Sequence, residues 1–206
     1  MKNYTREDYL KDLKNPEMLH IKSKERFKAF YEMLGNEPNQ KKQQIVLSRF
    51  NFIIPKGNII ELGCHAGFQC ISWGQQGFKC LGIDIAQSLI DEANRRINVI
   101  KNIKGKVKFI CSDILDLDLN KLGKFDTIVL TETLEHVIDP DPIFEKAVSF
   151  MDINSMLYIA APATRKGTYS HVRGITKDYI KKMAKKFNLL VEYESYNSNT
   201  RVILKK

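Results

Sequence analysis

Two glycines and two aspartates are spaced as in a site for a nucleoside-type ligand. The first segment is Glu61-x-Gly63-x-x-x-Gly67, and Asp84 follows Gly63 by 21 residues. Glycines in a turn before a helix let the backbone approach a ligand closely, and the helix N-terminus offers unpaired N–H groups. An acidic residue about 20 residues further on can bind the hydroxyls of a ribose. Asp113 comes next, placed to meet an adenine amino group, and the series predicts a nucleoside-type ligand.

The glycine spacing favours a cationic ligand over a dinucleotide. A pyrophosphate requires G-x-G-x-x-G, but here Cys64 and His65 fill the turn between Gly63 and Gly67. Glu61 would repel a pyrophosphate, and no Walker-A spacing is present. S-adenosylmethionine carries a sulfonium and an ammonium group and no phosphate, so it fits this site best.

A second group combines carboxylates with imidazoles. Glu132, Glu135 and His136 stand at positions i, i+3 and i+4, so one helical turn would place all three on one face. Such a set can supply a general base, hold a divalent metal ion, or only order its loop. Further along, His171 and Arg173 precede the last predicted helix. Arg173 has the donor fork that binds a carboxylate or phosphate, although both residues are equally consistent with bracing their loop.

From residue 58 onward, short apolar segments alternate with helical segments, which predicts a doubly wound, mostly parallel α/β sheet. The five parallel strands are expected at 58–62, 78–84, 106–111, 125–131 and 156–161, and the helices at 67–76, 87–102, 142–150 and 176–187. Strands at 189–196 and 201–205 are joined by a four-residue turn, so they must be antiparallel. The predicted fold is therefore a seven-stranded Rossmann-like sheet with a terminal antiparallel pair. In such sheets ligands bind beyond the carboxyl ends of the strands, where the residues above lie.

The N-terminal region has a different pattern. Thr5 and Ser23 are suited to cap helices, and a third helix is expected at 39–50. Residues 1–56 are therefore predicted as a helical cap or lid, and 57–206 as the cofactor-binding domain of one compact unit.

These residues resemble the class I S-adenosylmethionine-dependent methyltransferases, over residues 58–205. The likeness is closest to the broad group of ubiquinone-pathway O-methyltransferases and small-molecule enzymes. The segment from Glu61 to Gly67 is similar to the first motif of the family, and residues 131–140 resemble its segment after the fourth strand. His65 stands where a glycine is usual. The resemblance implies these cofactor-binding residues: Glu61, Gly63, Cys64, Gly67, Asp84, Ile85, Asp113, Ile114 and Thr131.

The resemblance also sharpens the choice between a base and a metal site. Glu132-x-x-Glu135-His136 looks like the metal-binding segment of certain quinone-pathway O-methyltransferases and of small-RNA 2′-O-methyltransferases. The latter add a downstream histidine, a role that His171 could fill. Because the segment is also common in metal-free members, we expect no metal, with His136 and His171 as catalytic residues beside the acceptor.

Composition limits the functional classes further. With 206 residues and ordinary hydrophobic content, the chain suits one domain with an appendage. The four cysteines form no CxxC pair, and neither a signal peptide nor an apolar run of about 18 residues is seen. We therefore expect a cytoplasmic protein. The net charge of +9 predicts a solvated basic surface or, less favoured, a nucleic-acid surface. The same choice applies to four lysines of the last helix: Lys181, Lys182, Lys185 and Lys186.

The expected function is S-adenosylmethionine-dependent methyl transfer to a small-molecule acceptor at oxygen or nitrogen. One alternative is a metal-dependent RNA 2′-O-methyltransferase. Another is a non-catalytic cofactor-binding protein that acts through partners. Neither the acceptor nor the oligomeric state follows from the sequence.

Overall fold

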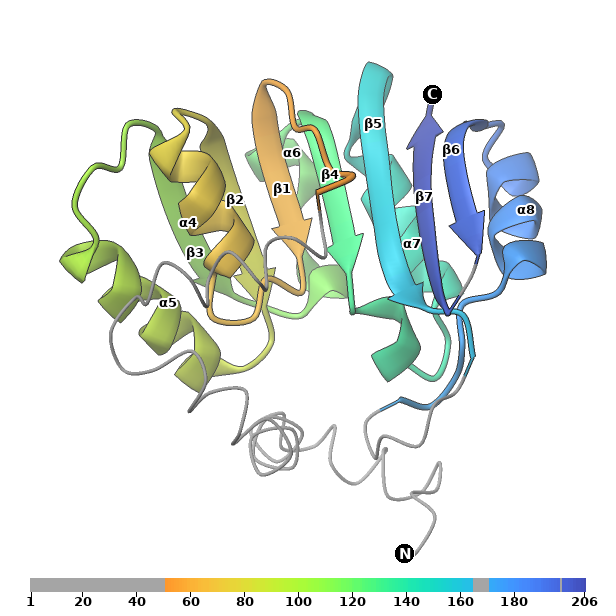
Figure 1. The fold of residues 1–206 in the computed structure, drawn as a ribbon, viewed down its shortest axis with the longest axis horizontal. Coiled ribbons are helices and arrows are strands. Elements are labelled where there is room, and N and C mark those ends of the chain that lie inside the picture. The colour runs from red at the N-terminus through yellow and green to blue at the C-terminus, as the bar shows by residue number, and fades with distance from the viewer. Residues whose placement is uncertain (1–50, 165–170, 197) are drawn as a thin grey trace, which may run out of the picture.

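The computed structural model describes residues 51–164, 171–196 and 198–206 (Figure 1). The predicted N-terminal helices, and nearly all of the predicted cap at 1–56, lie outside the described residues.

Seven strands form one sheet in the order β3-β2-β1-β4-β5-β7-β6. All neighbours are parallel except β7, which runs antiparallel to both β5 and β6. The predicted fold class is confirmed. The strands are β1 (Asn58–Leu62), β2 (Lys79–Asp84), β3 (Lys106–Cys111), β4 (Phe125–Thr131), β5 (Met151–Pro162), β6 (Leu190–Tyr196) and β7 (Asn199–Lys205).

Helices cover the two faces of the sheet. On one face, α4 (Phe68–Gln75) and α5 (Gln87–Val99) pack against β2 and β3. On the other, α7 (Asp141–Ser149) packs against β5 and α8 (Lys177–Lys186) against β6 (Figure 1). Three shorter helices follow strands: η1 (Ile114–Asp116), α6 (Leu119–Leu122) and η2 (Leu134–His136).

The core consists of two apolar layers, one on each face of the sheet. Alternate residues of a strand face opposite layers, so Ile60 and Leu157 pack with the α7 and α8 side chains. Their neighbours Ile59 and Tyr158 pack with the α4 side chains. Central strands buried on both faces read as continuous apolar runs, which is why the sequence predicts them well.

The structure corrects two expectations about where strands begin, in β5 and in β7. β5 begins at Met151, five residues before its predicted start, and its pairing with β4 is irregular between Phe125 and Thr127. β7 begins at Asn199 because residues 199 and 200 pair with Pro162 and Ala161 of β5, so the predicted four-residue turn is too long. Among the described residues, no helix combines the length and apolar character needed to cross a membrane.

Candidate functional site

The strand order reverses between β1 and β4, and the segments that follow these strands are tied together. The backbone N–H groups of Gly63 and Cys64 donate to the Ile83 carbonyl, both at 2.8 Å. The Thr133 hydroxyl donates to the Leu62 carbonyl at 3.0 Å. The turn after β1 is therefore fixed to β2 on one side and to the segment after β4 on the other, at the position where open α/β sheets bind ligands.

Both predicted glycines are needed, but for packing within the protein. Gly63 and Gly67 have φ values of +85° and +75°, which side chains rarely adopt. A Cβ atom at Gly63 would overlap Thr133, and one at Gly67 would overlap Phe109. His65 also adopts a left-handed conformation, with φ +51°, so the turn keeps its shape although a histidine replaces the usual glycine.

Asp84 is held by backbone groups on both sides. Its carboxylate accepts hydrogen bonds from the His65 N–H at 2.8 Å and from the Ala86 N–H at 3.0 Å. An ionised carboxylate has about four acceptor positions, so two backbone bonds orient it and leave capacity for ribose hydroxyls. Ile85, the next residue, is exposed. The cofactor contacts of Asp84 and Ile85 stay predictions.

Asp113 lies beside Asp84, at the end of the neighbouring strand. The Ser112 N–H donates to the Asp84 carbonyl at 2.9 Å, which joins the two strand ends. Asp113 caps η1 by accepting a hydrogen bond from the Leu115 N–H through Oδ1 at 2.9 Å. Ile114 is partly buried against the core. The capping role accounts for Asp113 within the protein, while its adenine contact stays a prediction.

Glu61 is more enclosed than the sequence suggested. It is 2% exposed, and the Cys70 thiol of α4 donates to its Oε2 at 3.1 Å. Burial raises the pKa of Glu61 to about 8, with a smaller contribution from Asp84. At neutral pH this carboxyl is therefore mostly uncharged. Cys64 is also buried, and burial raises the pKa of its thiol. The predicted cofactor contacts of Glu61 and Cys64 stay predictions.

Gln69 is a candidate that the sequence reasoning missed. Its side-chain N–H donates to the Thr131 hydroxyl at 2.8 Å, and among the described residues nothing donates to its buried Oε1. A buried amide oxygen without a donor suits a cationic ammonium group. The signal was present, because Gln69 is a polar residue in the first turn of the helix that follows Gly67.

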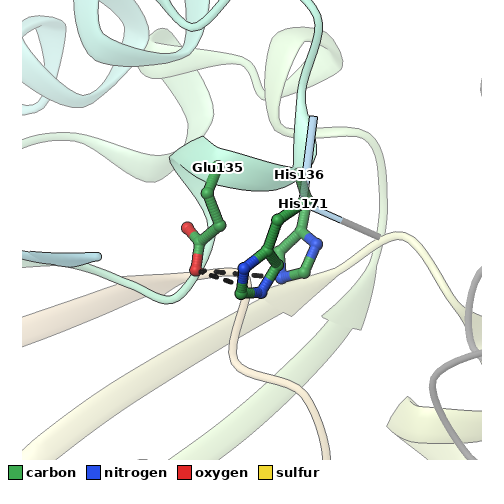
Figure 2. Close-up of side chains that lie close together, drawn as sticks. All are labelled: Glu135, His136 and His171. Atoms are coloured by element: carbon green, nitrogen blue, oxygen red, sulfur yellow. Dashed lines mark ion pairs between the residues drawn. The ribbon is translucent and has the colours of Figure 1, made fainter. Parts of the chain in front are cut away.

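Glu135, His136 and His171 come together from two separate segments (Figure 2). Glu135 Oε1 lies 3.9 Å from His136 Nε2 and 4.0 Å from His171 Nε2. The imidazole rings pack edge to face with centroids 4.9 Å apart. One possible ligand atom from each residue lies within 4.8 Å of the others. Glu132, the fourth residue of the predicted set, lies outside this group.

Burial dominates the electrostatics of the Glu135 cluster, meaning Glu135, His136 and His171. Glu135 is fully buried, and no hydrogen bond of ordinary geometry from a described residue reaches its carboxylate oxygens. Burial raises the pKa of Glu135 well above its usual value, and the nearby Glu132 raises it further. A positive charge beside Glu135, on an imidazole or a metal ion, would favour its ionised form.

The loop that carries His171 and Arg173 is anchored at both ends. The Val172 N–H donates to the Glu135 carbonyl at 2.9 Å, and the Ile175 N–H donates to the Pro162 carbonyl at 2.8 Å. Arg173 Nε is buried with no hydrogen-bond partner among the described residues. The loop therefore holds His171 in place, while an acceptor contact of Arg173 stays a prediction.

Comparisons with known proteins identify a family and several relatives. The profile of a protein family described as a methyltransferase domain matches residues 54–201. The ubiquinone biosynthesis O-methyltransferase of Rickettsia akari is 26% identical over 125 residues, which are 61% of this chain and 48% of that protein. The corresponding enzyme of Rickettsia conorii is 29% identical over 116 residues, 56% of this chain and 38% of the relative. The chain thus spans about half or less of the length of these relatives.

Solved structures of low sequence identity share the fold. Magnesium protoporphyrin IX methyltransferase from Synechocystis aligns with a TM-score of 0.67 at 17% identity, covering 87% of this chain and 94% of that one. A small RNA methyltransferase aligns with a TM-score of 0.64 at 18% identity, covering 82% of this chain and 26% of that one.

Proposed function

The chain belongs to the methyltransferase-domain family, as its sequence predicts, and we propose that it transfers the methyl group of S-adenosylmethionine to a small-molecule acceptor at oxygen or nitrogen. The observation that carries the proposal is Asp84, whose carboxylate two backbone N–H groups hold beside the turn after β1. Relatives named ubiquinone biosynthesis O-methyltransferase support a small-molecule acceptor.

The residues at the strand ends fit this cofactor. Asp84 would hold the ribose, and Asp113 with Ile114 would hold the adenine. The buried oxygen of Gln69, beside Thr131, suits the ammonium group. When bound, the cofactor supplies a methyl group activated by a sulfonium. The turn after β1 and its neighbouring segments position the ligand, and alignment of the acceptor lone pair accounts for much of the rate gain.

On the acceptor side, we assign removal of the acceptor's proton to the Glu135 cluster. An acceptor hydroxyl must lose its proton as its oxygen bonds to the methyl group, and a protonated nitrogen must lose one beforehand to free its lone pair. His136 is 34% exposed, so its imidazole is accessible to take this proton. The buried carboxylate of Glu135, 3.9 Å away, stabilises the resulting imidazolium. His171 packs against the His136 ring and orients it.

Binding of S-adenosylhomocysteine to Asp84 variants tests the cofactor assignment. Each hydrogen bond to a charged acceptor contributes about 1.5–3 kcal/mol, and Asp84 would accept two from the ribose hydroxyls, so Asp84→Ala should weaken binding at least a hundredfold. Asp84→Asn keeps one acceptor oxygen and should have an intermediate effect. Asp178→Ala, which changes an exposed residue of α8, serves as the control. Unchanged affinity in folded Asp84→Ala, or tighter binding of NADH, would reject the proposal.

A metal-dependent RNA 2′-O-methyltransferase is the second candidate. The observation in its favour is the Glu135 cluster, because one carboxylate and two imidazoles within 4.8 Å form a plausible set of ligands for a divalent ion. Turnover that needs a divalent ion, with RNA as acceptor, would favour it over the first proposal. A protein that binds the cofactor but methylates neither class would support the non-catalytic alternative.

A further inference from the structure

Among the described residues β3 pairs with β2 alone, which makes it an edge of the sheet on the side opposite to β6 (Figure 1). On one face, Val107 and Phe109 pack with the side chains of the α4 layer. On the other, Lys106, Lys108 and Ile110 are exposed. On its outer side the strand therefore has no backbone partner in the described part of the chain, and it presents one exposed row of side chains.

Five exposed lysines gather at this edge, on β2, on β3 and in the segment before β3. They are Lys79, Lys101, Lys104, Lys106 and Lys108, and we call them the edge lysines. None forms an ion pair with another described residue. Several basic residues elsewhere do pair with carboxylates, in Arg95–Glu92, Arg96–Glu92, Lys121–Asp118, Lys177–Glu194, Lys182–Asp141, Lys186–Glu145 and Lys205–Glu192.

The register between β2 and β3 places two of these charges side by side. Lys79 lies directly opposite Lys106. Like charges in directly opposed positions of a sheet destabilise it, whereas opposite charges contribute about 0.2–1 kcal/mol per pair. The edge lysines thus form an uncompensated positive surface that a negatively charged neighbour would stabilise.

The backbone of β3 favours an extended polypeptide as the binding partner. An edge strand presents free N–H and C=O groups, which another extended polypeptide can pair with. Edge lysines discourage pairing with neutral strands, and the same charges favour an acidic one. A nucleic acid could meet the lysines but could not continue the backbone ladder. We propose that β3 binds an extended acidic polypeptide segment as an eighth strand, with Asp or Glu at alternate positions facing Lys106 and Lys108.

The position of this surface makes it a docking site separate from the chemistry. Lys79 and Lys106 begin their strands, whereas Asp84 and Asp113 lie at or beyond the carboxyl ends. With a rise of about 3.3 Å per residue, the two ends of these strands are roughly 15–20 Å apart. The inference therefore goes beyond the proposed function.

Fluorescence anisotropy with two labelled peptides and the full chain tests the proposal. The first peptide, about ten residues long, alternates glutamate with threonine. The second replaces each threonine with proline, which keeps the charge but removes the N–H groups that pairing needs. We expect the first peptide to bind, and the second to bind at least tenfold more weakly. No binding of the first peptide, or equal binding of both, would overturn strand addition.

Charge-reversal variants locate the surface. Lys106→Glu/Lys108→Glu should weaken binding of the glutamate–threonine peptide at least tenfold, while Lys181→Glu/Lys185→Glu, the same charge change on α8, should alter it less than twofold. S-adenosylhomocysteine binding should be unchanged in the β3 variant, which separates this test from that of the proposed function. The thermal unfolding temperature should not fall, because Lys106→Glu places an opposite charge across from Lys79. Equal weakening by both variants, or displacement of the peptide by oligouridylate of equal charge at lower concentration, would reject the assignment.

Discussion

His136 and His171 share one buried carboxylate but differ in exposure. His136 is 34% exposed and His171 is 12% exposed, although their Nε2 atoms lie at nearly equal distances from Glu135 Oε1. A base must reach the acceptor, so exposure favours His136. A group that only orients the base can be enclosed, as His171 is. The same geometry would serve a metal ion, so the two readings need a test that separates them.

We expect turnover to persist in the presence of EDTA. Activity should rise with pH along a limb that reports loss of the imidazolium proton, and His136→Ala should flatten that limb. Glu132→Ala removes a carboxylate that helps to raise the pKa of Glu135 but is not itself part of the Glu135 cluster. Under the base mechanism this variant should shift the pH profile and keep turnover. Inhibition by EDTA, rescue by Mg²⁺ or Mn²⁺, and equal damage from Glu132→Ala, Glu135→Ala and His136→Ala would instead establish a metal site.

Glu61 should make the stability of the protein depend on pH. Its pKa is about 8 in the folded protein against an ordinary value of 4.5, so the folded state binds the proton more tightly. The contribution is complete below about pH 4.5 and is lost as the pH rises through about 8. Glu61→Gln removes this titration. As the pH rises between these limits, the free energy of unfolding of the variant should increase relative to that of the wild type by on the order of a few kcal/mol. Urea unfolding at pH 5 and pH 8.5 measures the gain, and an equal difference at both would contradict the burial argument.

At the scale of elements, the turn after β1 depends on both of its glycines. Gly63→Ala would force a side chain into a left-handed conformation and against Thr133. Left-handed strain costs about 1–2 kcal/mol and overpacking about 1–3 kcal/mol, so a loss of about 2–5 kcal/mol is expected. Gly77 has φ +104° with open space around it, so Gly77→Ala should show the strain alone. Comparable losses in thermal unfolding of the two variants would contradict the packing argument.

The long elements could be predicted from the sequence because their buried positions produce a recognisable pattern of apolar residues. β1, β3 and β4 have the predicted bounds, since central strands show continuous apolar runs and β3 alternates. η2 and α6, of three and four residues, are too short for a helical period. The grouping of His171 with Glu135 and His136 could be anticipated only from the family resemblance and not from the spacing, because it depends on the bond from Val172 to the Glu135 carbonyl. Gln69 was missed because no spacing rule includes it.

At the scale of the whole molecule, positive charge is unevenly compensated. On α8, Lys182 and Lys186 pair with Asp141 and Glu145 of α7 at 3.0 and 3.4 Å. These pairs join the two helices. The other two lysines of the predicted set, Lys181 and Lys185, are exposed and form no ion pair with a described residue. The α8 surface is therefore more consistent with a solvated face than with an RNA track. The edge lysines are a larger group of lysines without an ion pair among the described residues, and they lie toward the opposite end of the strands from the Glu135 cluster.

This charge distribution predicts weak RNA binding without sequence or end preference. For single strands, each phosphate contact gives a slope of about −0.7 in log affinity against log salt. Contacts with all five edge lysines would give about −3.5, so binding should disappear near physiological salt. Filter binding of oligouridylate between 50 and 200 mM salt measures the slope, and Lys106→Glu/Lys108→Glu should make it shallower. An RNA substrate must instead reach His136, beyond the carboxyl ends of the strands. Tight binding to one RNA end, reduced by Lys181→Glu/Lys185→Glu and unaffected by the β3 variant, would therefore contradict this prediction and favour the RNA methyltransferase.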